Sequence, residues 1–285
     1  MRLGSKTIAV VGGSAQTGNV TPEAAALLGA AAEPWGRAAA KRLALDGAEV
    51  LVMDPNAAWV EQTCDDIKAQ GGRCEAVVID IADFIALDAW ARERLEQGGR
   101  LDALVTCYLD IDWSSIENAD IEAFERVLVF NLAGPVKATK AFLPLLKRGE
   151  GASIVHVGSV DGIFGAPAVP SYSAAKGGLA PLTHIMAYEF ARYDIRVNTV
   201  ASCQTIELPA ALADSAARAY RGLPGGAYLK QLNDATPLKR KGPLTDWAGA
   251  ISFLVSSDAS FVTGAVLVVD CGRTIITPGT QLQYG

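Results

Sequence analysis

Short apolar runs alternate with longer helical patterns along almost the whole chain, and this alternation constrains its fold more than any other feature. The apolar runs occupy residues 6–12, 48–54, 75–81, 101–107, 152–159, 194–201 and 264–270, and the helical patterns occupy 37–46, 57–70, 83–97, 120–147, 171–192 and 245–256. Most apolar runs are continuous stretches of Val, Ile and Leu, which is typical of parallel strands covered on both faces. We therefore expect one doubly wound α/β domain over residues 1–285, with a seven-stranded parallel sheet and helices on both faces.

The composition narrows the possible partners of this domain. The 285 residues are 50% hydrophobic and 20% charged, so the chain can bury a sizeable core. The net charge is −6 and no basic stripe is present, so nucleic acid is not an expected partner. No apolar run approaches the roughly 20 residues that span a bilayer, so no membrane partner is expected. Strand-like sequence begins at Lys6, which leaves no room for a targeting peptide and favours a cytoplasmic location.

The cysteines and histidines give no pattern of a metal site. The five cysteines are Cys64, Cys74, Cys107, Cys203 and Cys271, and no two of them form a CxxC pair. This odd, scattered set predicts reduced thiols, as in a cytosolic protein. His156 and His184 lie far apart in apolar segments, which favours structural histidines over metal ligands.

A glycine-rich turn follows the first apolar run and precedes a helix, an arrangement that receives the pyrophosphate of a dinucleotide. The acidic residue expected about 20 residues later, at the end of the next strand, is Asp54. Asp54 lies 42 residues after Gly12, and two candidate closing glycines, Gly18 and Gly36, are 18 residues apart. We therefore predict that residues 17–34 are an insertion in the phosphate loop.

The insertion and the end of the second strand each allow a further prediction. Thr21, Pro22 and Glu23 have the pattern of a helix start, so the insertion is expected to form a short extra helix beside the pyrophosphate. The Asp54 carboxylate would repel a ribose 2′-phosphate, and no arginine follows it to offset that charge. The sequence therefore favours NAD over NADP.

A second Ala-rich region, 205–236, follows the sixth apolar run and contains the breaker GLPGG. Its position places it at the carboxyl edge of the sheet, where ligands bind in such folds. A mobile substrate lid is the interpretation that we favour, and a pair of ordinary surface helices is the alternative.

The segment 171–190 carries the residues most suggestive of chemistry. Tyr172 and Lys176 are four residues apart, so a helix places them on one face. A phenol ordinarily titrates near about 10, and an adjacent ammonium favours its ionised form. Ser159 ends a strand thirteen residues before Tyr172, and Asn131 lies in the preceding long helix. The structural alternatives are a strand-end cap for Ser159 and a backbone hydrogen bond for Asn131.

Taken together, these residues resemble the short-chain dehydrogenase/reductase family. The resemblance covers residues 6 to about 274 and rests on Tyr172-x-x-x-Lys176, Ser159, Asn131, Asp80 after the third strand and RVNTV at 196–200. It implies a Rossmann-type fold and an enzyme that passes a hydride between a nicotinamide and a substrate carbon.

The resemblance also implies roles for particular residues. Tyr172 would be the general acid/base at the carbonyl or carbinol oxygen, and Ser159 would position and polarise that oxygen. Lys176 would lower the pKa of Tyr172 and bind the nicotinamide ribose, and Asn131 would hold a water that links Lys176 to solvent. The residues expected at the cofactor are Gly12, Ser14, Ala15, Trp35, Gly36, Asp54, Asp80, Ile81, Thr106, Tyr172, Lys176 and Thr205, with Asp80 and Ile81 meeting the adenine.

Three departures from the family pattern all fall on the cofactor side. Pro34-Trp35-Gly36 replaces Gly-x-Gly, Thr106-Cys107-Tyr108-Leu109 replaces NNAG, and Ser202-Cys203 replaces PG, with Glu207 where a Thr is usual. Large side chains in place of the NNAG motif are expected to change the floor of the cofactor cleft. Cys203 is interpreted as a packing residue rather than a reactive thiol.

Two functions from different classes remain open at this point. The favoured one is an NAD(H)-dependent oxidoreductase that interconverts a secondary alcohol and a ketone on a mainly hydrophobic small molecule. The pocket wall is expected to include Ile163, Phe164, Tyr108 and residues 205–232, with no Arg or Lys placed to receive an anionic group. The alternative is a non-redox or cofactor-binding scaffold with a degenerate dinucleotide site. A homotetramer or homodimer built on the long helices at 120–147 and 171–192 is expected in either case.

Overall fold

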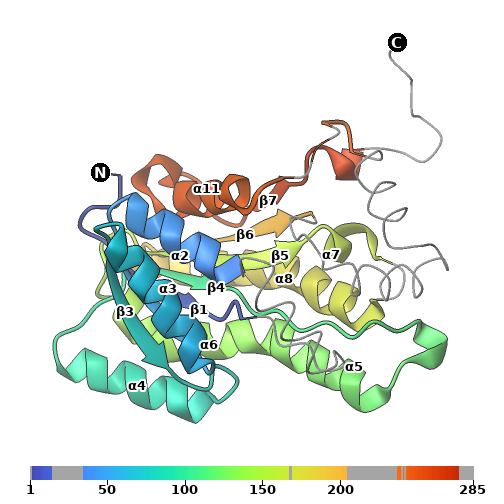
Figure 1. The fold of residues 1–285 in the computed structure, drawn as a ribbon, viewed down its shortest axis with the longest axis horizontal. Coiled ribbons are helices and arrows are strands. Elements are labelled where there is room, and N and C mark those ends of the chain that lie inside the picture. Colours follow the sequence, from blue (N-terminus) through green and yellow to red (C-terminus); the bar gives the residue numbers. More distant parts are fainter. Residues whose placement is uncertain are drawn as a thin grey trace.

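The computed structural model describes residues 2–14, 35–166, 169–203, 236–238, 240 and 242–275. These residues form one seven-stranded sheet with helices packed on both of its faces (Figure 1). The predicted insertion at 17–34 lies outside the described residues, and so does the predicted lid at 205–236 apart from Thr236.

All strands of the sheet are parallel, and their order is β3-β2-β1-β4-β5-β6-β7. The strands are β1 Thr7–Val11, β2 Glu49–Asp54, β3 Arg73–Val78, β4 Ala103–Thr106, β5 Ser153–Ser159, β6 Arg196–Ser202 and β7 Val266–Val269. The direction of winding reverses between β1 and β4, which is the point where ligands bind in open α/β sheets. The predicted Rossmann-type fold is therefore confirmed.

Helices connect the strands and lie in two layers. The α-helices are α2 Trp35–Leu45, α3 Ala57–Ala69, α4 Phe84–Glu96, α5 Ile121–Leu128, α6 Gly134–Leu146, α7 Asp161–Phe164, α8 Pro170–Phe190 and α11 Leu244–Val255. Short 3₁₀ turns occur at Ile116–Asn118, Ala191–Tyr193, Ser257–Ala259 and Arg273–Ile275. The helix predicted at 120–147 is interrupted by a π-helical turn, Val129–Ala133, between α5 and α6.

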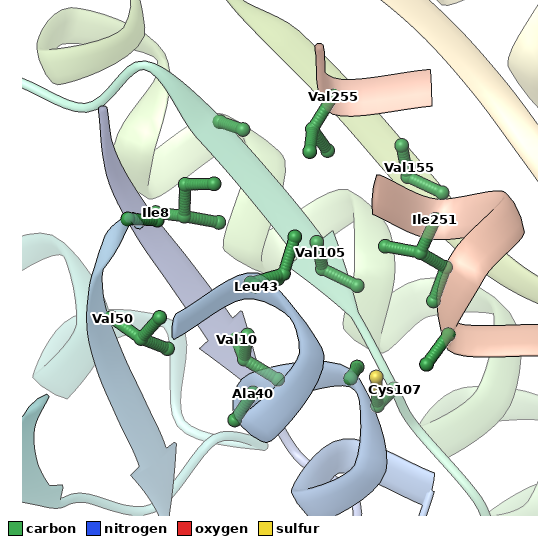
Figure 2. Packing of buried hydrophobic residues seen from close by; sticks show 14 of the residues in the cluster. Ile8, Val10, Ala40, Leu43, Val50, Val105, Cys107, Val155, Ile251 and Val255 are labelled. Carbon is green, nitrogen blue, oxygen red and sulfur yellow. The ribbon is translucent and has the colours of Figure 1, made fainter. Parts of the chain in front are cut away.

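Two apolar layers hold the helices on the sheet, because alternate residues of each strand point to opposite faces. Ile8 and Val10 of β1 face α2, α3 and α11, where Leu43 and Ile251 pack (Figure 2). Ala9 and Val11 belong to the other layer, beneath α4, α6 and α8. Both faces of β1 are fully buried, which explains its continuous apolar sequence.

A disulfide joins Cys64 of α3 to Cys74 of β3, with their Cα atoms 5.2 Å apart. The prediction of reduced thiols is therefore wrong for these two residues, because α3 packs directly against the strand that follows it. Cys107, Cys203 and Cys271 are free. The expectation of a cytoplasmic location rested in part on five reduced thiols, and only three of the cysteines are free. Among the described residues, no helix is long and apolar enough to cross a membrane.

Candidate active site

Tyr172 and Lys176 lie one turn apart near the start of α8, and both side chains are buried. Pro170 occupies the first turn of the helix, where its missing N–H is not needed. The Lys176 ammonium donates to the backbone carbonyls of Tyr108 and Val157, each at 2.8 Å. It lies 5.6 Å from the centre of the Tyr172 ring. The cation is therefore held beside the phenol by the ends of two strands.

Ser159 ends β5 and brings a hydroxyl to the same place. Its Oγ accepts the backbone N–H of Asp161 at 3.1 Å, and the Ser159 hydroxyl acts to lower the pKa of the Tyr172 phenol. The side chain is 6% exposed. The structure thus gathers Ser159, Tyr172 and Lys176 into one cluster, as the spacing of these residues predicts.

The protonation states in this cluster follow mainly from burial. Burial raises the pKa of Tyr172, the Asp161 carboxylate raises it further, and the Ser159 hydrogen bond lowers it in part. The net direction is upward, opposite to the one expected from Lys176 alone. Burial also lowers the pKa of Lys176 to about 7. In the protein without cofactor, Tyr172 is therefore a neutral phenol.

Asn131 lies in the π-helical turn between α5 and α6 and is fully buried. Its amide donates to the carbonyls of Asp110 and Val127 at 2.8 and 2.9 Å, and its oxygen accepts the Asp110 N–H at 3.2 Å. These bonds are the ones expected if Asn131 has a structural rather than a catalytic role, because they connect the loop after β4 to the helix. A water relay through Asn131 stays a prediction.

The glycine turn after β1 has the geometry that a phosphate loop needs. Gly12 and Gly13 have φ angles of +82° and +121°, where side chains are strained. A Cβ on Gly13 would lie 2.5 Å from the Cα of Gly36, and one on Gly36 would collide with the carbonyl oxygen of Gly12. Helix α2 therefore begins directly against the strand end, with its N-terminus at the turn. This cradle fits a pyrophosphate.

Asp54 ends β2 and is fully buried. The Ser14 hydroxyl and N–H donate to its carboxylate at 2.5 and 3.3 Å, and the Asn56 N–H donates at 3.0 Å. Burial raises the pKa of Asp54, and these hydrogen bonds oppose the shift. A carboxylate offers about four acceptor positions, so capacity remains for a ribose hydroxyl.

Two side chains predicted at the cofactor belong to the core instead. The Trp35 indole packs edge-on against Trp247 at 5.3 Å between ring centres, because α2 and α11 meet there. The Thr106 hydroxyl is hydrogen-bonded to Nδ1 of His156 at 2.8 Å, and both residues are buried within the sheet. Only the backbone of Trp35, at the first turn of α2, lies at the phosphate loop.

Four further residues were expected at the cofactor, and the structure describes two of them, Asp80 and Ile81. Asp80 is exposed and its carboxylate accepts the Ala82 N–H at 2.9 Å, whereas Ile81 is buried. Ala15 and Thr205 lie outside the described residues.

Tyr108, which replaces a small residue of the family pattern, does not line a pocket. It is 1% exposed, packs edge-on against Phe130 and donates its hydroxyl hydrogen to the carbonyl of Ile81 at 2.8 Å. Gly134 makes room, because a Cβ there would lie 2.6 Å from the Tyr108 ring. The expectation that Tyr108 forms the pocket wall is therefore wrong. Ile163 and Phe164, by contrast, are 51% and 48% exposed on α7.

Sequence reasoning missed an arginine near this site. Arg273 donates to the Sγ of Cys203 at 3.1 Å, and its guanidinium lies 5.2 Å from the centre of the Phe164 ring. It comes from the segment after β7, and nothing in the local sequence points to the site. Burial raises the pKa of Cys203, which keeps it a neutral thiol and agrees with a packing role.

The histidines do not form a metal site in the part of the chain that the structure describes. Burial, and then the Lys176 charge, lower the pKa of His156 to about 4, so it stays neutral beside Thr106. His184 is exposed on α8. No group of three or more His, Cys, Asp or Glu side chains is placed to hold a metal among these residues.

Known proteins resemble this chain in sequence and in fold. A family model described as enoyl-(acyl carrier protein) reductase matches residues 29–274. The uncharacterized oxidoreductase YxbG of Bacillus subtilis is 32% identical over 90% of this chain and 93% of its own length. Cyclopentanol dehydrogenase of Comamonas sp. is 30% identical, over 81% and 89% of the two chains. The solved structure of a dehydrogenase/reductase from Sinorhizobium meliloti has a TM-score of 0.76 and 29% identity, covering 95% of this chain and 96% of that one.

The Rossmann-type sheet and the similarity to these alcohol dehydrogenases show an oxidoreductase that acts on CH–OH groups. The chain belongs to the short-chain dehydrogenase/reductase family, whose dehydrogenases use nicotinamide cofactors.

Proposed function

We propose that this enzyme interconverts a secondary alcohol and a ketone with NAD(H), using Tyr172 as the general acid/base. The observation that carries the proposal is the cluster in which the Ser159 hydroxyl and the Lys176 ammonium flank the Tyr172 phenol. A bound nicotinamide would supply the hydride acceptor or donor. The residues of the chain would then handle the proton.

In the reductive direction, Tyr172 gives its proton to the carbonyl oxygen and Ser159 donates a hydrogen bond to the same atom. In the oxidative direction, Tyr172 takes the carbinol proton. Lys176 has three N–H donors, and two of them are held by backbone carbonyls. The third is the donor that we assign to the nicotinamide ribose.

The preference for NAD over NADP is assigned to Asp54. Its carboxylate lies at the end of β2, next to the strand that carries the phosphate loop. A ribose hydroxyl donates to such a carboxylate, whereas a 2′-phosphate is repelled by it. Because Ser14 already bonds Asp54, the glycine turn and the ribose site are coupled through one carboxylate.

A mainly hydrophobic small molecule is the substrate class that we favour. The exposed side chains of Ile163 and Phe164 on α7 follow directly after Ser159 in sequence. Arg273 above Phe164 adds one polar edge to this apolar wall. The expectation that no arginine or lysine is placed to receive an anionic group stays a prediction.

A homodimer or homotetramer is the assembly that we propose. An open apolar groove of about 580 Å³ lies between the α5–α6 region and α8. Its lining residues are Leu128, Val129, Leu132, Ala133, Val136, Gly178, Pro181, Leu182 and Ile185. Val129 and Ile185 are about half exposed, and a second copy covering this face would bury them. These are the helices that the sequence predicts at a subunit interface.

Cofactor titration tests the proposed function. By calorimetry, NAD(H) is expected to bind more tightly than NADP(H), and Asp54→Asn is expected to narrow that difference. NADH consumption with a panel of cyclic and aromatic ketones then measures turnover. Tighter binding of NADP(H) would refute the assigned cofactor. Absence of any nicotinamide binding would favour the scaffold alternative.

A further inference from the structure

A short segment, residues 79–82, crosses the carboxyl edge of the sheet beside the proposed dinucleotide site. It begins after β3, where the Ile79 N–H donates to the backbone carbonyl of Asp54 at 3.2 Å. Two residues later the Ile81 side chain reaches the glycine turn, since a Cβ on Gly12 would lie 3.1 Å from its Cδ1. The strands β3, β2 and β1 are neighbours in the sheet. The segment therefore passes Asp54, which we assign to the ribose of the adenosine half, and reaches the phosphate turn.

Tyr108, which follows β4, holds this segment with its side chain. Its hydroxyl donates to the backbone carbonyl of Ile81 at 2.8 Å, across 27 residues of sequence. Its ring is buried, packs edge-on against Phe130 and lies over Gly134, where a Cβ would come within 2.6 Å of it. Burial raises the pKa of Tyr108, so the hydroxyl keeps its hydrogen and acts as a donor. The phenol is thus a rigid link between the end of β4 and Ile81.

The backbone of the same residue contacts the other half of the site. The Tyr108 carbonyl accepts a hydrogen bond from the Lys176 ammonium at 2.8 Å. We assign Lys176 to the nicotinamide ribose, whereas Ile81 adjoins the adenosine half. Because β4 lies next to β1, Tyr108 stands at the point where the winding of the sheet reverses. One buried residue therefore connects both halves of the proposed cofactor site, through its carbonyl on one side and its hydroxyl on the other.

A second donor limits what the loss of the Tyr108 hydroxyl can do. Lys137 of α6 donates from Nζ to the Ala82 carbonyl at 2.8 Å, and the Asp80 carboxylate accepts the Ala82 N–H at 2.9 Å. Both bonds stay in place without the hydroxyl, so the segment is loosened and not unfolded. Ile81, whose carbonyl loses its donor, is also the residue that touches the glycine turn.

We propose that Tyr108 is a positioning residue for the dinucleotide, whose hydroxyl holds residues 79–82 ready for the adenosine half. The inference rests on the proposed NAD(H) function. A segment that is already held in its bound conformation loses less conformational entropy when the cofactor binds. The gain cannot exceed the net worth of one hydrogen bond, so removing the hydroxyl weakens binding by about 3- to 10-fold. The small residue of the family pattern cannot make this bond, so the device belongs to this chain.

Tyr108→Phe tests the proposal, because it removes only the hydroxyl and keeps the ring and the carbonyl that holds Lys176. Calorimetry with ADP-ribose, which lacks the nicotinamide, and with NADH should give dissociation constants about 3- to 10-fold above those of the wild type. With a ketone that the wild type reduces, kcat at saturating NADH should change little. Amide hydrogen exchange of the unliganded enzyme, read in a peptide that covers 79–83, should be faster in the variant and should slow when ADP-ribose binds.

Ser153→Ala is the matched control, because it also removes a buried hydroxyl that donates to a backbone carbonyl. That bond, to Leu254 at 3.1 Å, lies at the amino end of β5, away from the cofactor edge. The control should lower stability in urea and leave both dissociation constants and the exchange of 79–83 unchanged.

The outcomes separate this inference from the proposed function. Equal ADP-ribose affinity of wild type and Tyr108→Phe would overturn the inference, whatever the exchange rates, and leave the NAD(H) function standing. An equal loss of affinity in Ser153→Ala would also overturn it, because general destabilisation would then be the cause. A wild type that binds neither NADH nor ADP-ribose would overturn the proposed function and the inference together.

Discussion

Breaking the disulfide between Cys64 and Cys74 should weaken the fold by an amount that the chain itself defines. The two cysteines are 10 residues apart in sequence, so the closed loop is short. In the chain-entropy description, closing a loop of this size removes about 3 kcal/mol of unfolded-state entropy at 25 °C. Reduction breaks only this bond, because Cys107, Cys203 and Cys271 are already free. We therefore expect reduction to lower the free energy of unfolding by about 3 kcal/mol.

Urea unfolding with and without reductant measures this difference. Thiol titration of the denatured, unreduced protein establishes the starting state and should give three thiols of the five cysteines. A Cys64→Ala/Cys74→Ala variant is the control, and its unfolding curve should not respond to reductant. The reasoning is refuted by five titratable thiols in protein purified without reductant. It is also refuted by unfolding curves of the wild type that superimpose in both conditions.

Three further predictions concern the cofactor cradle, the buried histidine and the subunit surface. Gly36→Ala should destabilise the fold by about 1–3 kcal/mol through overpacking and weaken NADH binding in calorimetry. Gly249→Ala on α11 meets only the flexible end of Arg42 and should do neither. His156 has a folded pKa of about 4, below the unfolded value of 6.5, so stability present above pH 6.5 should fall progressively toward pH 4. His156→Gln should flatten that decline in the urea midpoint. Ile185→Lys should shift the protein to a smaller species in analytical ultracentrifugation, and an unchanged mass would contradict the proposed interface.

The sheet could be predicted because its strands are buried on both faces. In β1, β4, β5 and β6 both faces pack against helices, so the apolar run is continuous and easily distinguished from the amphipathic helices between them. The ordered residues Ser159, Tyr172 and Lys176 could be predicted for a related reason. Their spacing is local to one strand end and one helix, so no long-range packing has to be known.

The errors arise where tertiary packing decides the direction of a side chain. Trp35 is adjacent to the phosphate loop in sequence, but the nearby α11 places its indole in the core against Trp247. Tyr108 fits beneath the strand end only because Gly134, far along the chain, lacks a side chain. The pairing of Cys64 with Cys74 depends likewise on how α3 folds back on β3. No local pattern reports such contacts.

Asp161 and Arg273 illustrate the two kinds of missed site residue. Asp161 stands in SVDG, two positions from Ser159, so its place was visible in the sequence, although the contact of the next residue, Gly162, with the Tyr172 helix was not. Arg273 comes to the site from the segment after β7, more than 100 residues beyond Ser159. Only the order of the strands reveals that these two residues lie near each other.

The central claim is that the Tyr172 hydroxyl carries the proton during turnover, and Tyr172→Phe tests it most directly because only that oxygen is removed. Steady-state kinetics should show kcat/KM reduced by about 10²–10⁴-fold, the usual worth of a general acid/base. The NADH dissociation constant from calorimetry should change little. Turnover in the Phe variant close to that of the wild type, with cofactor binding intact, would contradict the account.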